Sequence, residues 1–140
     1  KHPKIILMRK QVSGRVDGAS AYHNIASMAR GYSAKRSSYG NAPGGYVKLR
    51  KQMLETMLYL ANTKGYTFNV TSIAGGSHSR TSRHYAGIAF DTSIINGRQV
   101  NYRNPYYRAF MRAGRAKGAT EVLGPGDRAH STHTHLAWPR

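Results

Sequence analysis

The sequence predicts an α+β fold in which helices pack against a small, mostly antiparallel sheet. Two observations support this class: residues 46–65 carry apolar side chains at helical spacing, and short β-type runs alternate with a second helical run after them. The length of 140 residues suits one domain with a buried core. We therefore expect a single domain over 1–140, with an irregular N-terminal arm over 1–45 and a core over 46–138.

The N-terminal arm has the least regular pattern. Residues 4–8 (KIILM) are compatible with an edge strand, and residues 31–46 (GYSAKRSSYGNAPGGY) have the composition of a loop. The arm is therefore interpreted mainly as a solvated connection.

The first elements of the core follow from periodicity. A helix is predicted within 46–65, because Met53, Met57 and Leu60 recur at helical intervals and Gly65 supplies a stop. Residues 66–76 are rich in β-branched and aromatic side chains and end in two glycines, which is typical of a strand.

Turn residues locate the remaining elements. A strand over 87–94 is followed by an Asn96-Gly97 turn and a return at 98–100. Asn104, as cap, and Pro105, as first residue, predict the start of a helix that runs to residue 118. Short strands are expected at 120–124 and 133–138.

The charge balance points to an anionic partner. The chain carries 22 Lys and Arg against five Asp and Glu, a formal net charge of +17, which attracts polyanions. No helix-turn-helix, zinc-finger or RNA-binding sheet signature accompanies the charge, so nucleic acid ranks well below other partners. The absence of cysteine excludes disulfides, thiolate metal sites and a cysteine nucleophile. No apolar run approaches the roughly 20 residues that span a bilayer, so no transmembrane segment is expected.

Histidines and one aspartate form the most informative pattern. Five of the seven histidines fall within residues 75–91 and 130–140. Asp91 stands inside a predicted strand, where a carboxylate is costly unless it is paired or bound to metal. Two imidazoles and one carboxylate form a recurring hydrolytic zinc set with a fourth position open for water. Taken singly, each histidine is more simply a hydrogen-bonding filler, and Asp91 a partner of an arginine. The pair His133 and His135 is assigned to opposite faces of its strand, so that only one of them faces the site.

The motif Ser82-x-His84-x-x-Gly87-x-Ala89-x-Asp91, followed by His133-Thr134-His135, resembles the zinc-dependent D-alanyl-D-alanine carboxypeptidases. That family shares its fold with peptidoglycan endopeptidases and the Hedgehog signalling domain. The resemblance covers roughly residues 46–138 and implies that this core binds zinc. It implies one Zn²⁺ ion bound by His84, Asp91 and His135.

The resemblance also implies roles around the metal. His133 would line the site and stabilise a transition state, and His78 matches a histidine that borders the zinc cleft. For a peptidase of this kind we expect His78, Arg80 and Ser82 to contact the substrate. The usual general base lies three positions before the last zinc histidine. That position is Thr132 here, and a threonine cannot take a proton at neutral pH. Three substitutes stay open: Asp127, His130 and, ranked last, Glu121.

Two functions follow from this pattern. The first is a secreted zinc metallopeptidase that hydrolyses peptide bonds in bacterial peptidoglycan stem peptides and is drawn by its charge to an anionic wall. The second is a catalytically impaired zinc-binding module that binds an anionic polymer, namely a sulfated glycan, a wall polymer or a mineral surface. The position of Thr132 favours the second function.

Overall fold

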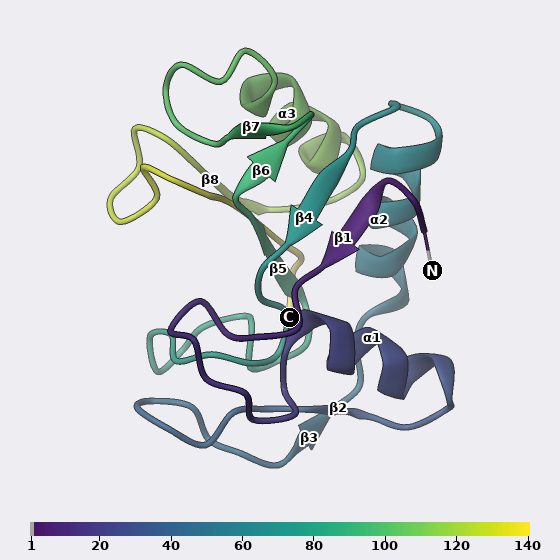
Figure 1. Ribbon diagram of the computed structural model, residues 1–140, viewed down its shortest axis with the longest axis vertical. Helices are drawn as coiled ribbons and strands as arrows, with labels where there is room; N and C mark the ends of the chain where they lie inside the picture. Colours follow the sequence, from purple (N-terminus) through teal and green to yellow (C-terminus); the bar gives the residue numbers. More distant parts are fainter. Residues whose placement is uncertain (1) are drawn as a thin grey trace.

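The computed structural model describes residues 2–140, and within them the fold is α+β, as the sequence predicts. Three helices lie against three small sheets, in place of the single sheet expected (Figure 1). The pairing is antiparallel except between β1 and β4. The elements are β1 (Ile5–Leu7), α1 (Ala21–Ala29), β2 (Ala34–Lys35), β3 (Tyr46–Val47), α2 (Lys51–Asn62), β4 (Phe68–Val70), β5 (Ala89–Thr92), β6 (Ile94–Ile95), β7 (Arg98–Gln99), α3 (Tyr107–Ala116), β8 (Glu121–Leu123) and β9 (Thr134–Ala137).

Helix α2 confirms the strongest periodic signal of the sequence. Met53, Met57 and Leu60 are all buried in the core, as expected for one face of a helix. The predicted range starts at residue 46, but the helix begins at Lys51, because Tyr46 and Val47 form β3 and pair with β2. Gly65 has φ +76 in the turn that follows, a conformation that glycine adopts without strain.

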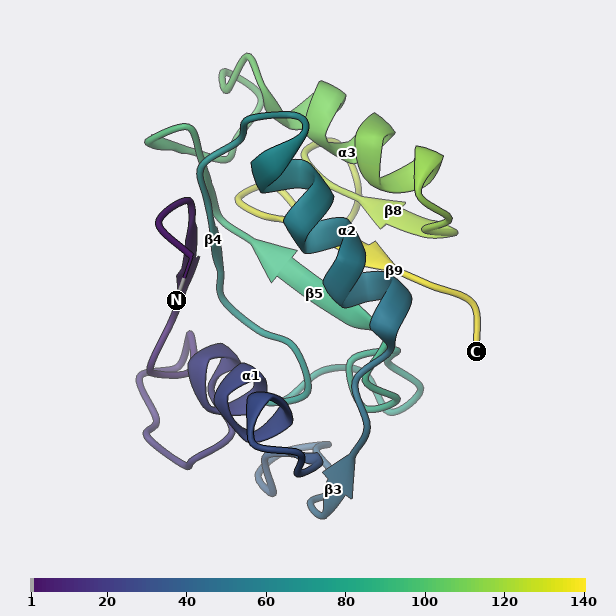
Figure 2. The ribbon, with the colours of Figure 1, turned by 90° about the vertical axis from the view of Figure 1, so that its right-hand side faces the viewer.

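The sheet that positions the candidate site has the order β5-β9-β8. Asp91 on β5 pairs directly with His135 on β9, which in turn pairs with Leu123 on β8. Helix α3 packs on the face of this sheet opposite to the side chains of Asp91 and His135 (Figure 2). There Gly114 approaches Leu136 so closely that an added Cβ would lie 2.6 Å from Leu136 Cδ1.

Helix α3 corrects the predicted cap. The helix begins at Tyr107, and Asn104 does not cap it. The buried Asn104 amide instead donates to the carbonyl oxygens of Arg98 and Gln99, and its Oδ1 accepts from the Tyr106 N–H. Asn104 therefore holds the β7 strand against the start of α3. The hairpin formed by β6, the Asn96-Gly97 turn and β7 agrees with the prediction.

The N-terminal segment contains more structure than a solvated connection. β1 pairs in parallel with β4, and α1 is capped by the Ser20 hydroxyl, which accepts from the His23 N–H. Asn24 is buried, and its side-chain oxygen accepts from the Ala74 N–H at 2.9 Å. Helix α1 is nine residues long, which is shorter than an isolated helix needs in water, so its stability depends on these tertiary contacts.

The segment before α1 is organised around Asp17. Its Oδ1 accepts from Gln11 Nε2 and from the Ala19 N–H, both at 3.0 Å, and its Oδ2 accepts from the Ser37 hydroxyl. Ser37 in turn accepts from the Gly76 N–H at 2.8 Å. Burial raises the pKa of Asp17, but the hydrogen bonds outweigh burial and set the pKa below its ordinary value of 3.8. Asp17 thus ties the N-terminal segment to the loop that leads into the candidate site.

We expect Asp17→Asn to lower the free energy of unfolding by about 1–2 kcal/mol at pH 7, because the Ser37 hydroxyl loses its carboxylate acceptor and the two hydrogen bonds to Oδ1 lose the charge of theirs. Since the folded pKa is depressed, the carboxylate stabilises the fold above about pH 3.8 and loses this effect as the pH falls through the folded pKa. Urea unfolding at pH 7 and pH 3 measures both values. The exposed Glu55→Gln is the matched control, and an equal destabilisation at both pH values would contradict the prediction.

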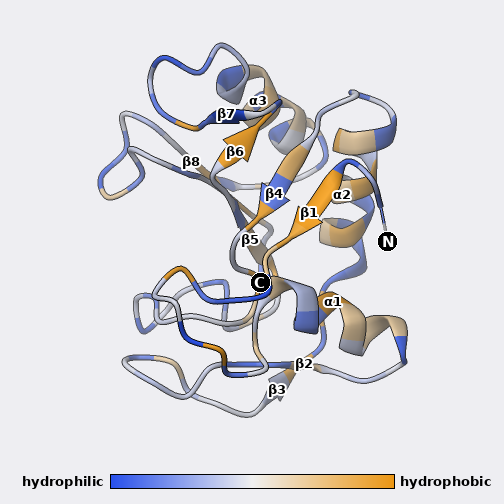
Figure 3. Cartoon of the chain, viewed as in Figure 1, coloured by the Kyte–Doolittle hydropathy of each residue, from blue (hydrophilic) through white to orange (hydrophobic). Residues whose placement is uncertain are grey.

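Apolar side chains gather in the interior of this fold. Figure 3 shows β1 and β6 as hydrophobic, whereas β7 and parts of α3 are hydrophilic. The core includes Phe68, Phe90, Phe110 and Trp138, all essentially inaccessible to solvent. None of the helices within residues 2–140 has the length and apolar character needed to cross a membrane.

Candidate metal centre

Asp91 is the centre of a buried cluster of polar side chains. Its Oδ1 atom lies 3.1 Å from His84 Nε2 and 3.0 Å from His135 Nδ1. His84 comes from the turn before β5, and the register of β5 with β9 places His135 opposite Asp91. All three side chains are buried. The structure therefore brings together the three residues that the sequence motif nominates as metal ligands.

The outer hydrogen bonds determine which atoms of these imidazoles carry hydrogen. His84 Nδ1 lies 2.7 Å from the Ile73 carbonyl oxygen, which can only accept, so Nδ1 must donate. His135 Nε2 lies 2.7 Å from Glu121 Oε1, and donation there leaves Nδ1 without hydrogen in the neutral ring. Two nitrogen lone pairs then face the same carboxylate oxygen. This arrangement needs protons or a cation at its centre, and it is the outer hydrogen-bonding pattern of metal-bound histidines.

The charges of the cluster are strongly coupled. Burial by itself raises the pKa of Asp91, but the neighbouring His84 and His135 hold that pKa well below its ordinary value, so Asp91 is ionised at neutral pH. Burial lowers the pKa of His135, yet the hydrogen bonds and charges of Asp91 and Glu121 raise it overall. The site thus holds negative charge that a cation can neutralise.

His78, which we expected to contact substrate, lies next to His84 and Asp91 in the buried cluster. One ligand atom each from His78, His84 and Asp91 lie within 4.8 Å of one another, so these three residues could hold a metal ion. The His78 ring stacks on the His84 ring with centroids 3.9 Å apart and planes at 14°. His78 Nε2 is 2.9 Å from the Gly75 carbonyl oxygen, and burial lowers the pKa of His78 to about 4.

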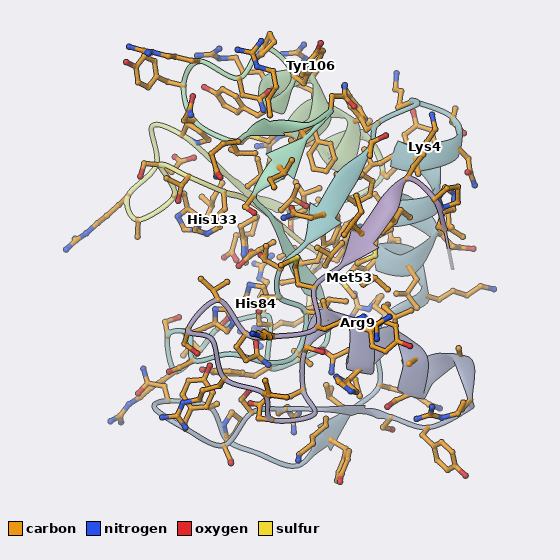
Figure 4. The ribbon with its side chains drawn as sticks, viewed as in Figure 1. Lys4, Arg9, Met53, His84, Tyr106 and His133 are labelled. Atoms are coloured by element: carbon orange, nitrogen blue, oxygen red, sulfur yellow. The ribbon has the colours of Figure 1, made fainter. Side chains whose placement is uncertain are left out.

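His133 and His135 both face the cluster, which corrects the expectation that they point to opposite faces. His133 Nε2 lies 4.0 Å from Asp91 Oδ2, while His135 contacts Asp91 Oδ1. The physical reason is that residues two positions apart along an extended chain point to the same side. Burial lowers the pKa of His133, which favours the neutral imidazole. In Figure 4, the labelled His84 and His133 extend toward the same region of the molecule from different segments.

A cavity of about 670 Å³ opens beside the cluster. Ser82, His130 and Glu121 contribute to its wall, and the Ser82 hydroxyl accepts from the His84 N–H at 3.1 Å. The His130 ring lies 4.7 Å from the His133 ring, and its Nδ1 donates to the Arg128 carbonyl oxygen at 2.6 Å. The residues that line the cavity are His78, Ser79, Thr81, Ser82, Arg83, His84, Asp91, Glu121, Leu123, Ala129, His130, His135 and Arg140.

Three residues considered from the sequence lie away from this cavity wall. Arg80 and Thr132 are exposed and do not line it. Asp127 is also exposed, and its Oδ2 accepts from the Gly124 N–H at 2.9 Å, which closes a local turn. The carboxylate that the fold does bring to the site is Glu121.

Arg83 belongs to the site although the sequence did not single it out. Its Nε lies 3.9 Å from Glu121 Oε2, and its Nη1 donates to Thr120 Oγ1 at 2.9 Å. Tyr85 was also missed: its hydroxyl contacts the backbone N–H and carbonyl oxygen of His78. Arg83 and Tyr85 flank His84 in the Ser82–Asp91 motif, but no sequence signal links Arg83 to Glu121 on β8 or Tyr85 to the backbone of His78.

Comparisons with protein-family models, curated proteins and solved structures returned no match for this chain. The assignment of the centre therefore depends on the positions and chemistry of its own side chains.

Proposed function

We propose that the protein is a zinc-dependent peptidase that hydrolyses peptide bonds in the stem peptides of bacterial peptidoglycan. One observation carries the proposal: His84 Nε2 and His135 Nδ1 both contact Asp91 Oδ1, while Ile73 and Glu121 accept the outer hydrogens of the two imidazoles. The sequence motif that resembles zinc D-alanyl-D-alanine carboxypeptidases supplies these three ligands. The proposed substrate class comes from that resemblance.

The donor set suits zinc. Neutral imidazole nitrogen and carboxylate oxygen are zinc ligands, and three protein ligands leave a fourth position beside the cavity for water or substrate. When bound, zinc polarises a carbonyl group and lowers the pKa of a coordinated water to about 7. The buried negative charge of Asp91 balances part of the charge of the ion.

We assign His135, and not His78, as the third ligand. An imidazole lone pair lies in the plane of its ring, so the stacked rings of His78 and His84 direct their lone pairs side by side instead of toward one point. In addition, His78 Nε2 is occupied by the Gly75 carbonyl oxygen and by Ser72 Oγ at 3.1 Å. His78 then supports the His84 ring and borders the cavity.

Side chains of the cavity wall, together with His133 beside Asp91, provide the remaining functions of a hydrolase. Glu121 binds the outer N–H of His135 with Oε1, while Oε2 is left near Arg83, so Glu121 can accept a proton at the cavity wall. His133, which lies on the Asp91 Oδ2 side, can stabilise negative charge on a substrate oxygen. His130 adds a second imidazole next to His133.

The net charge of +17 supports the proposal that the protein works next to a polyanion such as a bacterial cell wall, and therefore that it is secreted. Peptidoglycan is the proposed substrate. The charge concentrates the protein on a negatively charged polymer without specifying the bond that is cleaved.

Metal removal tests the proposal directly. We expect the zinc-loaded protein to release D-alanine or stem-peptide fragments from soluble muropeptides, and dialysis against a chelator to abolish this turnover. Stoichiometric Zn²⁺ should restore activity, because the ligands are organised by the fold. Product formation is followed by mass spectrometry. If metal-loaded protein leaves muropeptides and intact peptidoglycan uncleaved, the peptidase assignment is wrong.

A second candidate function is a non-catalytic zinc module that binds an anionic polymer. Thr132 favours it, because it stands where the resembling peptidases carry their acid and is exposed outside the cavity wall. Under this function zinc stabilises the fold and turnover is absent. The same experiment separates the two: a zinc-dependent rise in melting temperature without product formation supports the module.

A further inference from the structure

Helix α3 presents a row of arginines to solvent. Arg108, Arg112 and Arg115 are exposed and follow i, i+4, i+7 spacing, which places them on one side of the helix, about 6 Å and about 4.5 Å apart along its axis. The opposite side of α3 buries Phe110 and Gly114 against the core. In Figure 4, long side chains tipped with nitrogen gather around the labelled Tyr106, at the start of this helix.

The three arginines surround a shallow depression. A cavity of about 310 Å³ lies between them, with Tyr107, Met111, Val122 and Pro125 completing its lining. Met111, Val122 and Pro125 therefore give the depression an apolar lining, and the three arginines give it cationic side chains. Such a surface can hold the carbon skeleton of a ligand while binding its anionic groups.

The charge of this row is uncompensated. Among residues 2–140, none of the three α3 arginines forms a salt bridge. The five acidic residues of the chain lie elsewhere: Asp17 is bound in the N-terminal segment, Asp91 and Glu121 in the metal centre and Asp127 in the turn at Gly124, while Glu55 lies on α2. A row of unpaired guanidinium groups is a binding surface for anions.

This row is separate from the metal centre. Leu136 contacts Gly114 of α3, whereas the next residue back along β9, His135, points to Asp91. Because successive residues of a strand point to opposite faces, α3 and the metal cluster lie on opposite sides of the β5-β9-β8 sheet. A polymer bound along α3 therefore leaves the cavity beside Asp91 open.

We propose that the row of Arg108, Arg112 and Arg115 binds the phosphodiester groups of a linear polyol-phosphate polymer of the teichoic-acid type. Arginine binds phosphate through two parallel hydrogen bonds, and the repeated spacing suits a chain with regularly placed charges. Tyr107 lines the depression, but it is buried and the Arg108 guanidinium lies over its ring, 4.8 Å from the centroid, so that face of the ring is not open to a stacking base. The choice of a wall polymer over nucleic acid rests on the proposed function, because the proposed substrate lies in the same wall.

The test compares two triple variants that remove the same charge. We expect R108Q/R112Q/R115Q to weaken binding to a purified poly(glycerol phosphate) chain about tenfold or more, and to reduce the slope of log affinity against log salt by about two. K10Q/R15Q/R30Q removes three exposed cations from the N-terminal half and should leave affinity within about twofold. Microscale thermophoresis measures both, with DNA of equal charge as competitor.

The readouts separate this proposal from the peptidase assignment. Binding is measured with chelator present, so it should persist in protein without metal and without turnover. If the two triple variants lose affinity equally, the effect reflects net charge alone, and the proposed binding site on α3 is wrong. Displacement by DNA at much lower concentration than by poly(glycerol phosphate) would overturn the wall-polymer assignment. The single variants R108Q, R112Q and R115Q give the same comparison if the triple variant unfolds, each with a smaller loss.

Discussion

Replacing Asp91 with alanine is expected to abolish stoichiometric zinc binding. Asp91 Oδ1 is the one atom that both His84 Nε2 and His135 Nδ1 contact, so its removal deletes one ligand and the charge that balances the ion. We expect zinc content to fall from about one ion per chain to near zero after dialysis, and turnover to fall at least about 10²-fold, as expected when the metal is lost. Inductively coupled plasma mass spectrometry and muropeptide hydrolysis measure the two effects.

Matched variants sharpen the test of the ligand set. Asp127→Ala removes an exposed acid that closes a local turn, and it should retain zinc and activity. His135→Ala should lose zinc, whereas His78→Ala should retain it with weaker affinity, because His78 only stacks on His84. The opposite result for these two histidines would assign the ion to the group of His78, His84 and Asp91. Retained zinc stoichiometry in folded Asp91→Ala protein, with folding checked by circular dichroism, would rule out both sets.

Replacing Glu121 with glutamine is expected to lower kcat by about 10²–10⁴-fold while zinc stays bound. Glutamine keeps an oxygen that accepts the outer N–H of His135, but it cannot take a proton. Steady-state kinetics on a muropeptide and zinc titration of the same preparation give the two numbers.

Glu121→Ala separates the two roles of this side chain. Alanine also removes the acceptor for His135 Nε2, so zinc affinity should fall about 10–100-fold in addition to the loss in kcat. Asp127→Asn and His130→Gln test the other candidates for the base that the sequence left open. A large loss of kcat in either of these variants, with Glu121→Gln near wild type, would move the proton acceptor away from Glu121.

The fold could be predicted where local signals and tertiary packing agree. Helix α2 has a periodic apolar stripe that the core buries, and the Asn96-Gly97 turn fixes a hairpin by its own backbone preference. Helix α1 could not be predicted in this way. It is only nine residues long, and it is held by Asn24, which contacts a residue 50 positions away in the chain. The prediction that Asn104 caps a helix was wrong for a related reason, since the Asn104 side chain bonds to β7 instead.

The sequence alone determined the class of the fold and the excess of positive charge, because both depend on residue type and spacing along the chain; its resemblance to the zinc carboxypeptidases nominated His84, Asp91 and His135 together. Only the tertiary structure decided which carboxylate joins the centre. Glu121 and Asp127 are both among the five acids and equally plain in the sequence, but β8 pairs with β9 and so places Glu121 on His135. It also decided that α3 turns its arginines away from the metal centre. These relations arise from strand register and from packing between distant segments, which no local pattern encodes.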